Sequence, residues 1–164
     1  MTCENNTLRM VYEPLGEWVG HRAWCEYAYD HEAEEWGYRA TAPVTFRFPA
    51  YHARFKTLGG PHWRTLASGS IEVDVGFKFA PSGPAIDDES SVVGSCVHDI
   101  LCHPVIDRGR VVYPCSYMRA HRLYRLINRA QGQHWCRSWY QWAALVACNW
   151  IVRLDDKATA VQMG

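Results

Sequence analysis

Two adjacent residues, His98 and Asp99, are the first candidates for chemistry in this chain of 164 residues. On a helix, adjacent side chains point about 100° apart, so the pair would flank an apolar face rather than share it. Cys102 follows His98 by four residues, and His103 follows Asp99 by four, which gives each member of the pair a partner on its own side of the helix. Imidazole, thiolate and carboxylate are the usual protein ligands of zinc.

A further histidine lies on the helix predicted to come next. His121 falls on the apolar face of that helix, where a histidine must be hydrogen-bonded or ligated. If the two helices pack together, His121 approaches His98 or Asp99. The pattern predicts a transition-metal site, such as zinc, on His98, Cys102 and His121. The competing interpretation is a hydrogen-bonded core histidine and an aspartate bonded to nearby backbone amides, and the residue types leave both open.

The same region carries a series of motifs in a fixed order, between Val75 and Trp142. They are Gly76-Phe77, then Ser-Gly-Pro-Ala-Ile-Asp from Ser82, then His98-Asp99-Ile100-Leu101, then Ala120-His121, then the aromatic stretch from Trp135 to Tyr140. This order resembles a family of small phage and prophage proteins catalogued as domain of unknown function thirteen-fifty-three. The chain departs from the family pattern in three places: it lacks the Asp-Gly before the turn, and it has Cys102 in place of Tyr and His121 in place of Asp.

The resemblance implies a tailed-phage virion component or assembly accessory protein that acts through protein–protein contacts. Its expected partners are other phage structural proteins, with a homo-oligomer as a further possibility, and its expected location is the host cytoplasm during synthesis and then the virion. Aromatic side chains are enriched at protein interfaces. We therefore expect the aromatic residues of the last helix to form an interface: Trp135, Trp139, Tyr140, Trp142 and Trp150.

The motif order is also similar to that of the calcium-dependent secreted phospholipases of the A-two type. By that similarity His98 would be the general base, and Asp99 would hold Ca²⁺ together with the backbone carbonyls of Ser82, Gly83 and Pro84. His121 would take the place of the aspartate that orients the base. A second imidazole cannot stabilise the imidazolium as a carboxylate does. The alternative function is therefore an ester hydrolase of this type, degenerate in this chain, and contact with a membrane is expected only under that alternative.

The elements that position these residues divide the chain into a β half, 1–79, and an α half, 80–164. We expect strands over Leu8–Tyr12, over Trp18–Tyr29 with a break at Gly20, and over Trp36–Phe48 with an edge or a bend at Pro43. A clear alternation of apolar and polar residues predicts one strand from Ser70 to Phe79.

Three helices are expected in the second half of the chain. The first is capped by Asp88 or Ser90 and ends before Pro104. The second is capped by Ser116, and the third runs from Trp135 to about Val152. The predicted class is α+β in a single domain, 1–164, with N-terminal antiparallel strands or hairpins followed by a bundle of three C-terminal helices.

Composition limits the remaining options. The chain has 17 basic and 17 acidic residues, but its eight arginines from Arg108 to Arg153 have no Asp or Glu among them. We expect no specific nucleic-acid partner, because no stacking platform or reader motif accompanies the arginines. Nucleic-acid binding through Arg119, Arg122, Arg125 and Arg129 stays open as a lesser alternative. No cofactor is expected beyond Ca²⁺ or Zn²⁺. The N-terminus shows no signal-peptide pattern, and the seven cysteines predict reduced, mostly buried thiols.

Overall fold

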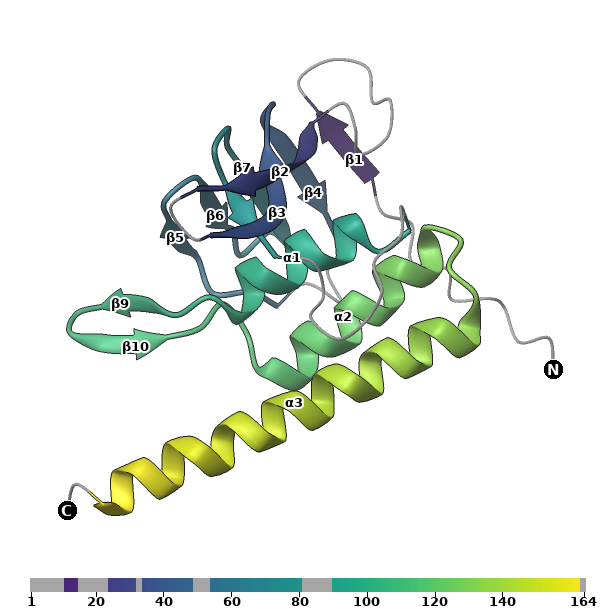
Figure 1. The fold of residues 1–164 in the computed structure, drawn as a ribbon. Coiled ribbons are helices and arrows are strands. Elements are labelled where there is room, and N and C mark those ends of the chain that lie inside the picture. Colours follow the sequence, from purple (N-terminus) through teal and green to yellow (C-terminus); the bar gives the residue numbers. More distant parts are fainter. Residues whose placement is uncertain (1–10, 15–23, 32–33, 49–53, 81–89, 163–164) are drawn as a thin grey trace, which may run out of the picture.

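The computed structural model describes residues 11–14, 24–31, 34–48, 54–80 and 90–162, with side-chain environments given from Trp24 to Cys148 within these ranges. Antiparallel sheets come first along the chain and three helices follow, which confirms the α+β layout (Figure 1). The strands are β1 (Val11–Pro14), β2 (Cys25–Asp30), β3 (Glu35–Ala40), β4 (Val44–Arg47), β5 (Leu58–Gly60), β6 (Trp63–Thr65), β7 (Ser70–Val73), β8 (Lys78–Phe79), β9 (Val105–Asp107) and β10 (Arg110–Val112). The helices are α1 (Val92–Cys102), α2 (Tyr117–Ala130) and α3 (Trp135–Gln162).

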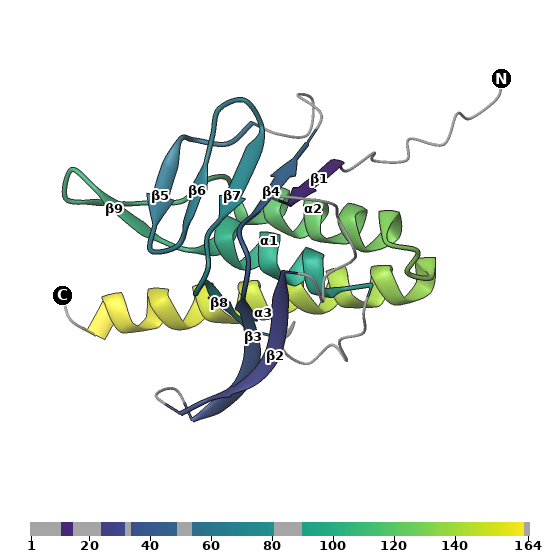
Figure 2. The same cartoon turned by 90° about the horizontal axis from the view of Figure 1, so that it is seen from above.

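The strands form three sheets, and every pairing between them is antiparallel. The five-stranded sheet has the order β1-β4-β7-β6-β5, the three-stranded sheet has the order β2-β3-β8, and β9 and β10 form a separate hairpin. The hairpin of β2 and β3 extends away from the five-stranded sheet in the view from above (Figure 2). The expected strand at Leu8–Tyr12 is described only from Val11, and the first half of the one expected at Trp18–Tyr29 lies outside the described residues.

Two of the expected strands are each divided between the sheets. The prediction of one strand from Ser70 to Phe79 was wrong, whereas an edge or a bend was expected at Pro43 in the other strand, which divides at residues 41–43. The expected Trp36–Phe48 strand becomes β3 and β4, and the expected Ser70–Phe79 strand becomes β7 and β8. Both divisions fall at one corner, where Ala40 N–H donates to the Phe77 carbonyl and Gly76 N–H donates to the Ala40 carbonyl, each at 2.9 Å. Gly76 has φ +94°, a conformation that favours glycine, and it turns the chain out of the first sheet.

The main core lies between the sheets and α1. Trp24, fully buried, joins the two sheets: its ring meets Phe46 of the larger sheet edge-on at 5.5 Å and stacks on Phe79 of the smaller sheet at 6.1 Å. Along α1, the residues from Val92 to Val97 and both Ile100 and Leu101 are buried. This burial explains the apolar stripe that predicted the helix.

The three helices lie side by side, with α2 between α1 and α3 (Figures 1 and 2). Helix α2 begins after Ser116, as predicted, whereas the residue before α1 is Ser91 rather than Asp88 or Ser90. Helix α3 starts at Trp135 as predicted but runs to Gln162, ten residues beyond the predicted end at Val152. A buried hydrogen bond of 3.2 Å from Asn128 Nδ2 to Gln141 Oε1 links α2 to α3.

Candidate metal centre

Helices α1 and α2 bring three potential metal ligands together. His98 Nε2 lies 2.8 Å from His121 Nδ1 and 3.5 Å from Cys102 Sγ, and the three ligand atoms all lie within 4.8 Å of one another. The i, i+4 spacing places His98 and Cys102 on one side of α1, and His121 faces them from the buried side of α2. The predicted approach of His121 to His98 is therefore present in the structure.

Aromatic rings surround the two histidines and fix their planes. The His98 and His121 rings stack with centroids 5.0 Å apart and planes 20° apart. Tyr124 packs its edge against His98 at 5.6 Å, and Tyr117 lies 6.4 Å from His121. His121 is 2% exposed, and the His98 side chain is 13% exposed. The cluster is therefore shielded from solvent, which strengthens electrostatic interactions inside it.

Asp99 supports this cluster from the other side of His98. Its Oδ1 lies 3.6 Å from His98 Nδ1, while its Oδ2 accepts a hydrogen bond of 2.9 Å from the Ala80 backbone N–H. A histidine that binds a metal through one ring nitrogen usually directs its other N–H at a carboxylate or carbonyl. Asp99 is placed to fill that role, and with Nδ1 carrying the proton the Nε2 lone pair of His98 points at His121 and Cys102.

The distances allow a direct test of whether a tetrahedral ion fits. Zinc bonded at about 2.0–2.1 Å to nitrogen and about 2.3 Å to sulfur sets its ligand atoms about 3.3 Å apart for an N–N pair and about 3.5 Å apart for an N–S pair. The Cys102–His98 distance of 3.5 Å already matches. The His98–His121 distance of 2.8 Å is that of a hydrogen bond, so the rings must separate by about 0.5 Å. The third pair, His121 and Cys102, lies within 4.8 Å and has to reach about 3.5 Å. With these side-chain adjustments the residue types fit the ion.

Without a cation the Cys102 thiol is strongly held in its protonated form. Burial raises the pKa of Cys102 well above its ordinary value, and the nearby Asp99 carboxylate and Cys115 thiol raise it further. A coordinated divalent cation reverses this effect, because a thiol bound to zinc is deprotonated outright. Cys102 is therefore a neutral thiol without a metal ion and a thiolate ligand when one is bound.

The other residues predicted to take part in the site are not seen to join the cluster of His98, Cys102 and His121. His103 does not meet Asp99: it is exposed at the end of α1, with its ring 5.9 Å from Trp63. The carbonyls of Ser82, Gly83 and Pro84, named for the calcium interpretation, lie outside the described residues. Residue 121, expected in place of the orienting aspartate, contacts His98 through an imidazole nitrogen.

The aromatic residues predicted to form an interface differ in how exposed their side chains are. Trp135, Trp139 and Tyr140 are exposed, Trp142 is partly buried against Trp139, and the side chain of Trp150 lies outside the described part. The prediction of mostly buried thiols holds only in part for the six described cysteines, all of which are free. Two are buried, two are half-buried and two are exposed: Cys25, Cys96, Cys102, Cys115, Cys136 and Cys148.

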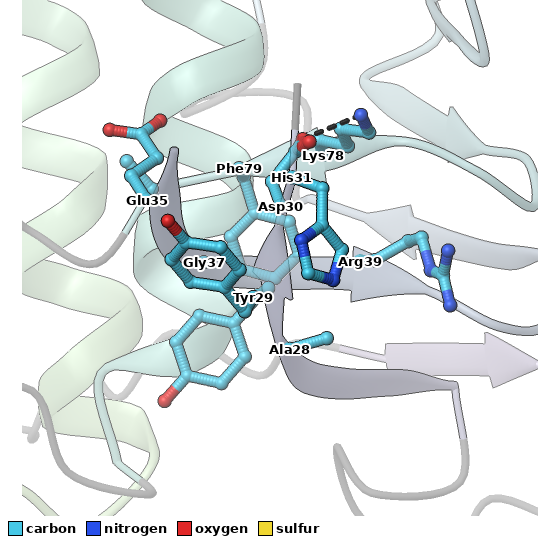
Figure 3. Close-up of a pocket in the computed structure, with 11 residues that line it drawn as sticks. Ala28, Tyr29, Asp30, His31, Glu35, Gly37, Arg39, Lys78 and Phe79 are labelled. Atoms are coloured by element: carbon cyan, nitrogen blue, oxygen red, sulfur yellow. Dashed lines mark ion pairs between the residues drawn. The ribbon is translucent and has the colours of Figure 1, made fainter. Parts of the chain in front are cut away.

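A pocket of about 360 Å³, distinct from the metal cluster, lies against β2, β3 and β8 (Figure 3). It was not predicted from the sequence. Tyr29, Phe79 and the ion pair of Asp30 with Lys78, 2.5 Å long, line it. The alternation of aromatic residues along β2 and β3 was the only available signal. This pocket brings together no set of groups comparable to the metal cluster.

Comparison with known proteins gives no name for this arrangement. The chain matches no family model, no curated protein and no solved structure at a significant level. Within the described residues, none of the helices is both long and apolar enough to cross a membrane. The interpretation of the site depends on its own geometry.

Proposed function

We propose that this chain is a metal-binding protein in which one transition-metal ion, most simply Zn²⁺, joins α1 to α2 through His98, Cys102 and His121. The observation that carries the proposal is the convergence of three nitrogen and sulfur ligand atoms within 4.8 Å, with Asp99 behind His98. Three protein ligands leave a fourth position for water or an added ligand, as in zinc sites that keep an open position. The ion would crosslink two helices that are otherwise held by packing.

The test is metal loading of the full chain, followed by Co²⁺ substitution. We expect one metal per chain, a visible Co²⁺ spectrum with a thiolate charge-transfer band, and loss of that band in Cys102→Ser. Binding to the folded state alone, at a free metal concentration 100 times Kd, stabilises by about 2.7 kcal/mol, which raises Tm by roughly 5–11 °C.

Matched variants separate ligation from general damage. Cys136→Ser and His103→Ala alter exposed residues outside the cluster and should retain the cobalt spectrum. His121→Ala should abolish it. Substoichiometric metal in protein prepared without chelator, together with a Co²⁺ spectrum that survives in Cys102→Ser, would overturn the proposal.

A second function is supported by a different surface, the aromatic face of the β2–β3 hairpin. Tyr27 and Trp36 stack at 5.4 Å although they are 54% and 56% exposed, and Tyr29 meets the edge of Trp36 at 5.5 Å. Tyr27 also contacts Tyr38 across the strand pair, and Tyr38 stacks on the buried Phe79, so this aromatic face is continuous with the core. Clustered exposed aromatics of this kind mark protein interfaces.

We propose, on this second observation, that the chain is a component or assembly accessory of a phage particle and that the hairpin contacts another structural subunit. The chain should then be detected by mass spectrometry in purified virions. A folded Tyr27→Ser/Trp36→Ser variant should fail to incorporate. Absence of the unmodified chain from virions would contradict the proposal.

The hydrolase alternative receives less support from the geometry. His98 Nδ1, the nitrogen that would activate water, faces the Asp99 carboxylate, and His98 Nε2 meets an imidazole rather than a carboxylate. An imidazole does not stabilise the imidazolium that a general base becomes. Calcium-dependent ester hydrolysis that disappears in His98→Ala would restore this alternative.

A further inference from the structure

The exposed side of α2 carries a groove lined by arginines. Arg119, Arg122 and Arg125 line it together with Met118 and Leu126 of the same helix and Trp142 of α3, and its volume is about 610 Å³. No acidic residue occurs between Arg108 and Arg153 in the sequence. The groove therefore combines three guanidinium groups with apolar walls, and the described residues that line it include no carboxylate.

The hydrogen bonds of these arginines to other described residues go to backbone carbonyls. Arg119 donates to the backbone carbonyl of Arg54 at 3.1 Å, and Arg129, one turn beyond the groove, donates to that of Gln133 at 2.5 Å. Within the described residues, none of the arginines of α2 forms an ion pair with a carboxylate. Backbone carbonyls orient a guanidinium without cancelling its charge, so the groove attracts anions.

Indole rings lie directly beside this charge. The Arg125 guanidinium sits 4.6 Å from the centre of the Trp139 ring, and Trp139 meets Trp142 edge-on at 4.9 Å. Trp139 is 45% exposed and Trp135 is 58% exposed. The packing of α3 against α2 therefore places the exposed aromatic ring of Trp139 beside a groove arginine, which the sequence alone did not reveal.

We infer that the groove between α2 and α3 binds the backbone of a single-stranded nucleic acid, with the phosphates on the α2 arginines and a base on the exposed tryptophans of α3. Basic grooves with adjacent aromatic rings are the means by which proteins hold single strands without sequence preference. Planar guanidinium groups match phosphate oxygens through two hydrogen bonds. The rise from Arg119 to Arg125 is about 9 Å, which suits two or three phosphates.

The experiment measures binding of the full chain to fluorescein-labelled oligothymidylate at several salt concentrations. Three phosphate contacts on a single strand predict a slope of log K against log salt of about −2, which falls to about −1.4 in Arg122→Gln. Arg122 is exposed, so this variant should keep its fold. Trp139→Ala should weaken binding while leaving the slope unchanged, because stacking does not release counterions.

The control is Arg110→Gln, which removes an exposed arginine from β10, in the hairpin that projects away from the helices (Figure 1). It should leave both affinity and slope unchanged. Polyglutamate of matched charge tests for an acidic protein partner instead. The inference is overturned if polyglutamate competes as well as oligothymidylate, if binding does not depend on salt, or if Arg110→Gln weakens binding as much as Arg122→Gln.

Discussion

Gly94 lies one turn before His98, at a close contact between α1 and α2. A Cβ added there would lie 2.0 Å from Asn128 Oδ1, 3.0 Å from Asn128 Cγ and 3.2 Å from Tyr124 Cδ2. Ordinary carbon–oxygen contacts are about 3.3 Å, so Gly94→Ala forces either a helix separation of about 1.3 Å or a rotation of the Asn128 amide. Asn128 is fully buried and bonded to Gln141, which leaves it little freedom to move.

The cost of this substitution can be worked out from those contacts. Loss of the Asn128–Gln141 hydrogen bond destabilises the protein by about 1–3 kcal/mol, and overpacking a filled layer adds about 1–3 kcal/mol. Alanine's better helix propensity returns about 1 kcal/mol. The net loss is about 3 kcal/mol, which lowers Tm by roughly 6–12 °C.

Thermal unfolding followed by circular dichroism measures this loss, with Gly59→Ala as the matched control. A Cβ at Gly59 would meet its nearest atoms at ordinary distances of 3.6 and 3.7 Å, so that variant should stay within about 0.5 kcal/mol of the unmodified chain. Gly94→Ala should also weaken Co²⁺ binding, because it separates the helices that carry the ligands. A Gly94→Ala protein that melts at or above the original temperature would refute the close helix contact.

Three further predictions concern Cys25, Thr65 and Asp99. Iodoacetamide should label exposed Cys136 before Cys25, because burial raises the pKa of Cys25 to about 12. The folded state holds the Cys25 proton more tightly than the unfolded state, whose thiol has a pKa of 9.0. The stability from this group should therefore be present below pH 9.0 and be lost as the pH rises toward 12, which urea unfolding at several pH values measures. Thr65→Val should cost about 1–3 kcal/mol in the same urea assay, because the fully buried Thr65 hydroxyl bonds two backbone groups of the preceding segment. Asp99→Ala should lower Co²⁺ affinity by about 10–100-fold in a spectroscopic titration. The substitution removes the carboxylate beside His98 Nδ1 and the acceptor of the Ala80 N–H. An unchanged affinity would show that the carboxylate does not support His98 as a ligand.

The helices and the ligand cluster could be predicted from the sequence because both depend on local spacing. The i, i+4 pair of His98 and Cys102 defines one side of α1, and a histidine on an otherwise apolar helix face had to meet a polar partner. The contact of Asp99 with Ala80 could not be predicted in the same way. It joins residues 19 positions apart, across a segment whose path no periodicity indicates.

The division of strands between two sheets shows the limit of an alternating pattern. Alternation continues unbroken from Ile71 to Phe79, yet the chain leaves one sheet after Val73 and enters the other at Lys78. Gly76 was the only local sign of the bend. The hairpin of β9 and β10 was missed because its strands have three residues each and its turn, with positive φ at Arg108 and Gly109, lacks the Asn-Gly or Asp-Gly signal of such turns.

Helix α2 carries His121 on its buried side and the groove arginines on its exposed side, so one rigid body belongs to both proposed sites. Any coupling free energy between the two sites acts reciprocally. If zinc raises the affinity for a polyanion by some factor, the polyanion raises the affinity for zinc by the same factor. The protein would then report metal availability as a change in nucleic-acid occupancy. Measuring oligothymidylate affinity with and without zinc would give that coupling directly.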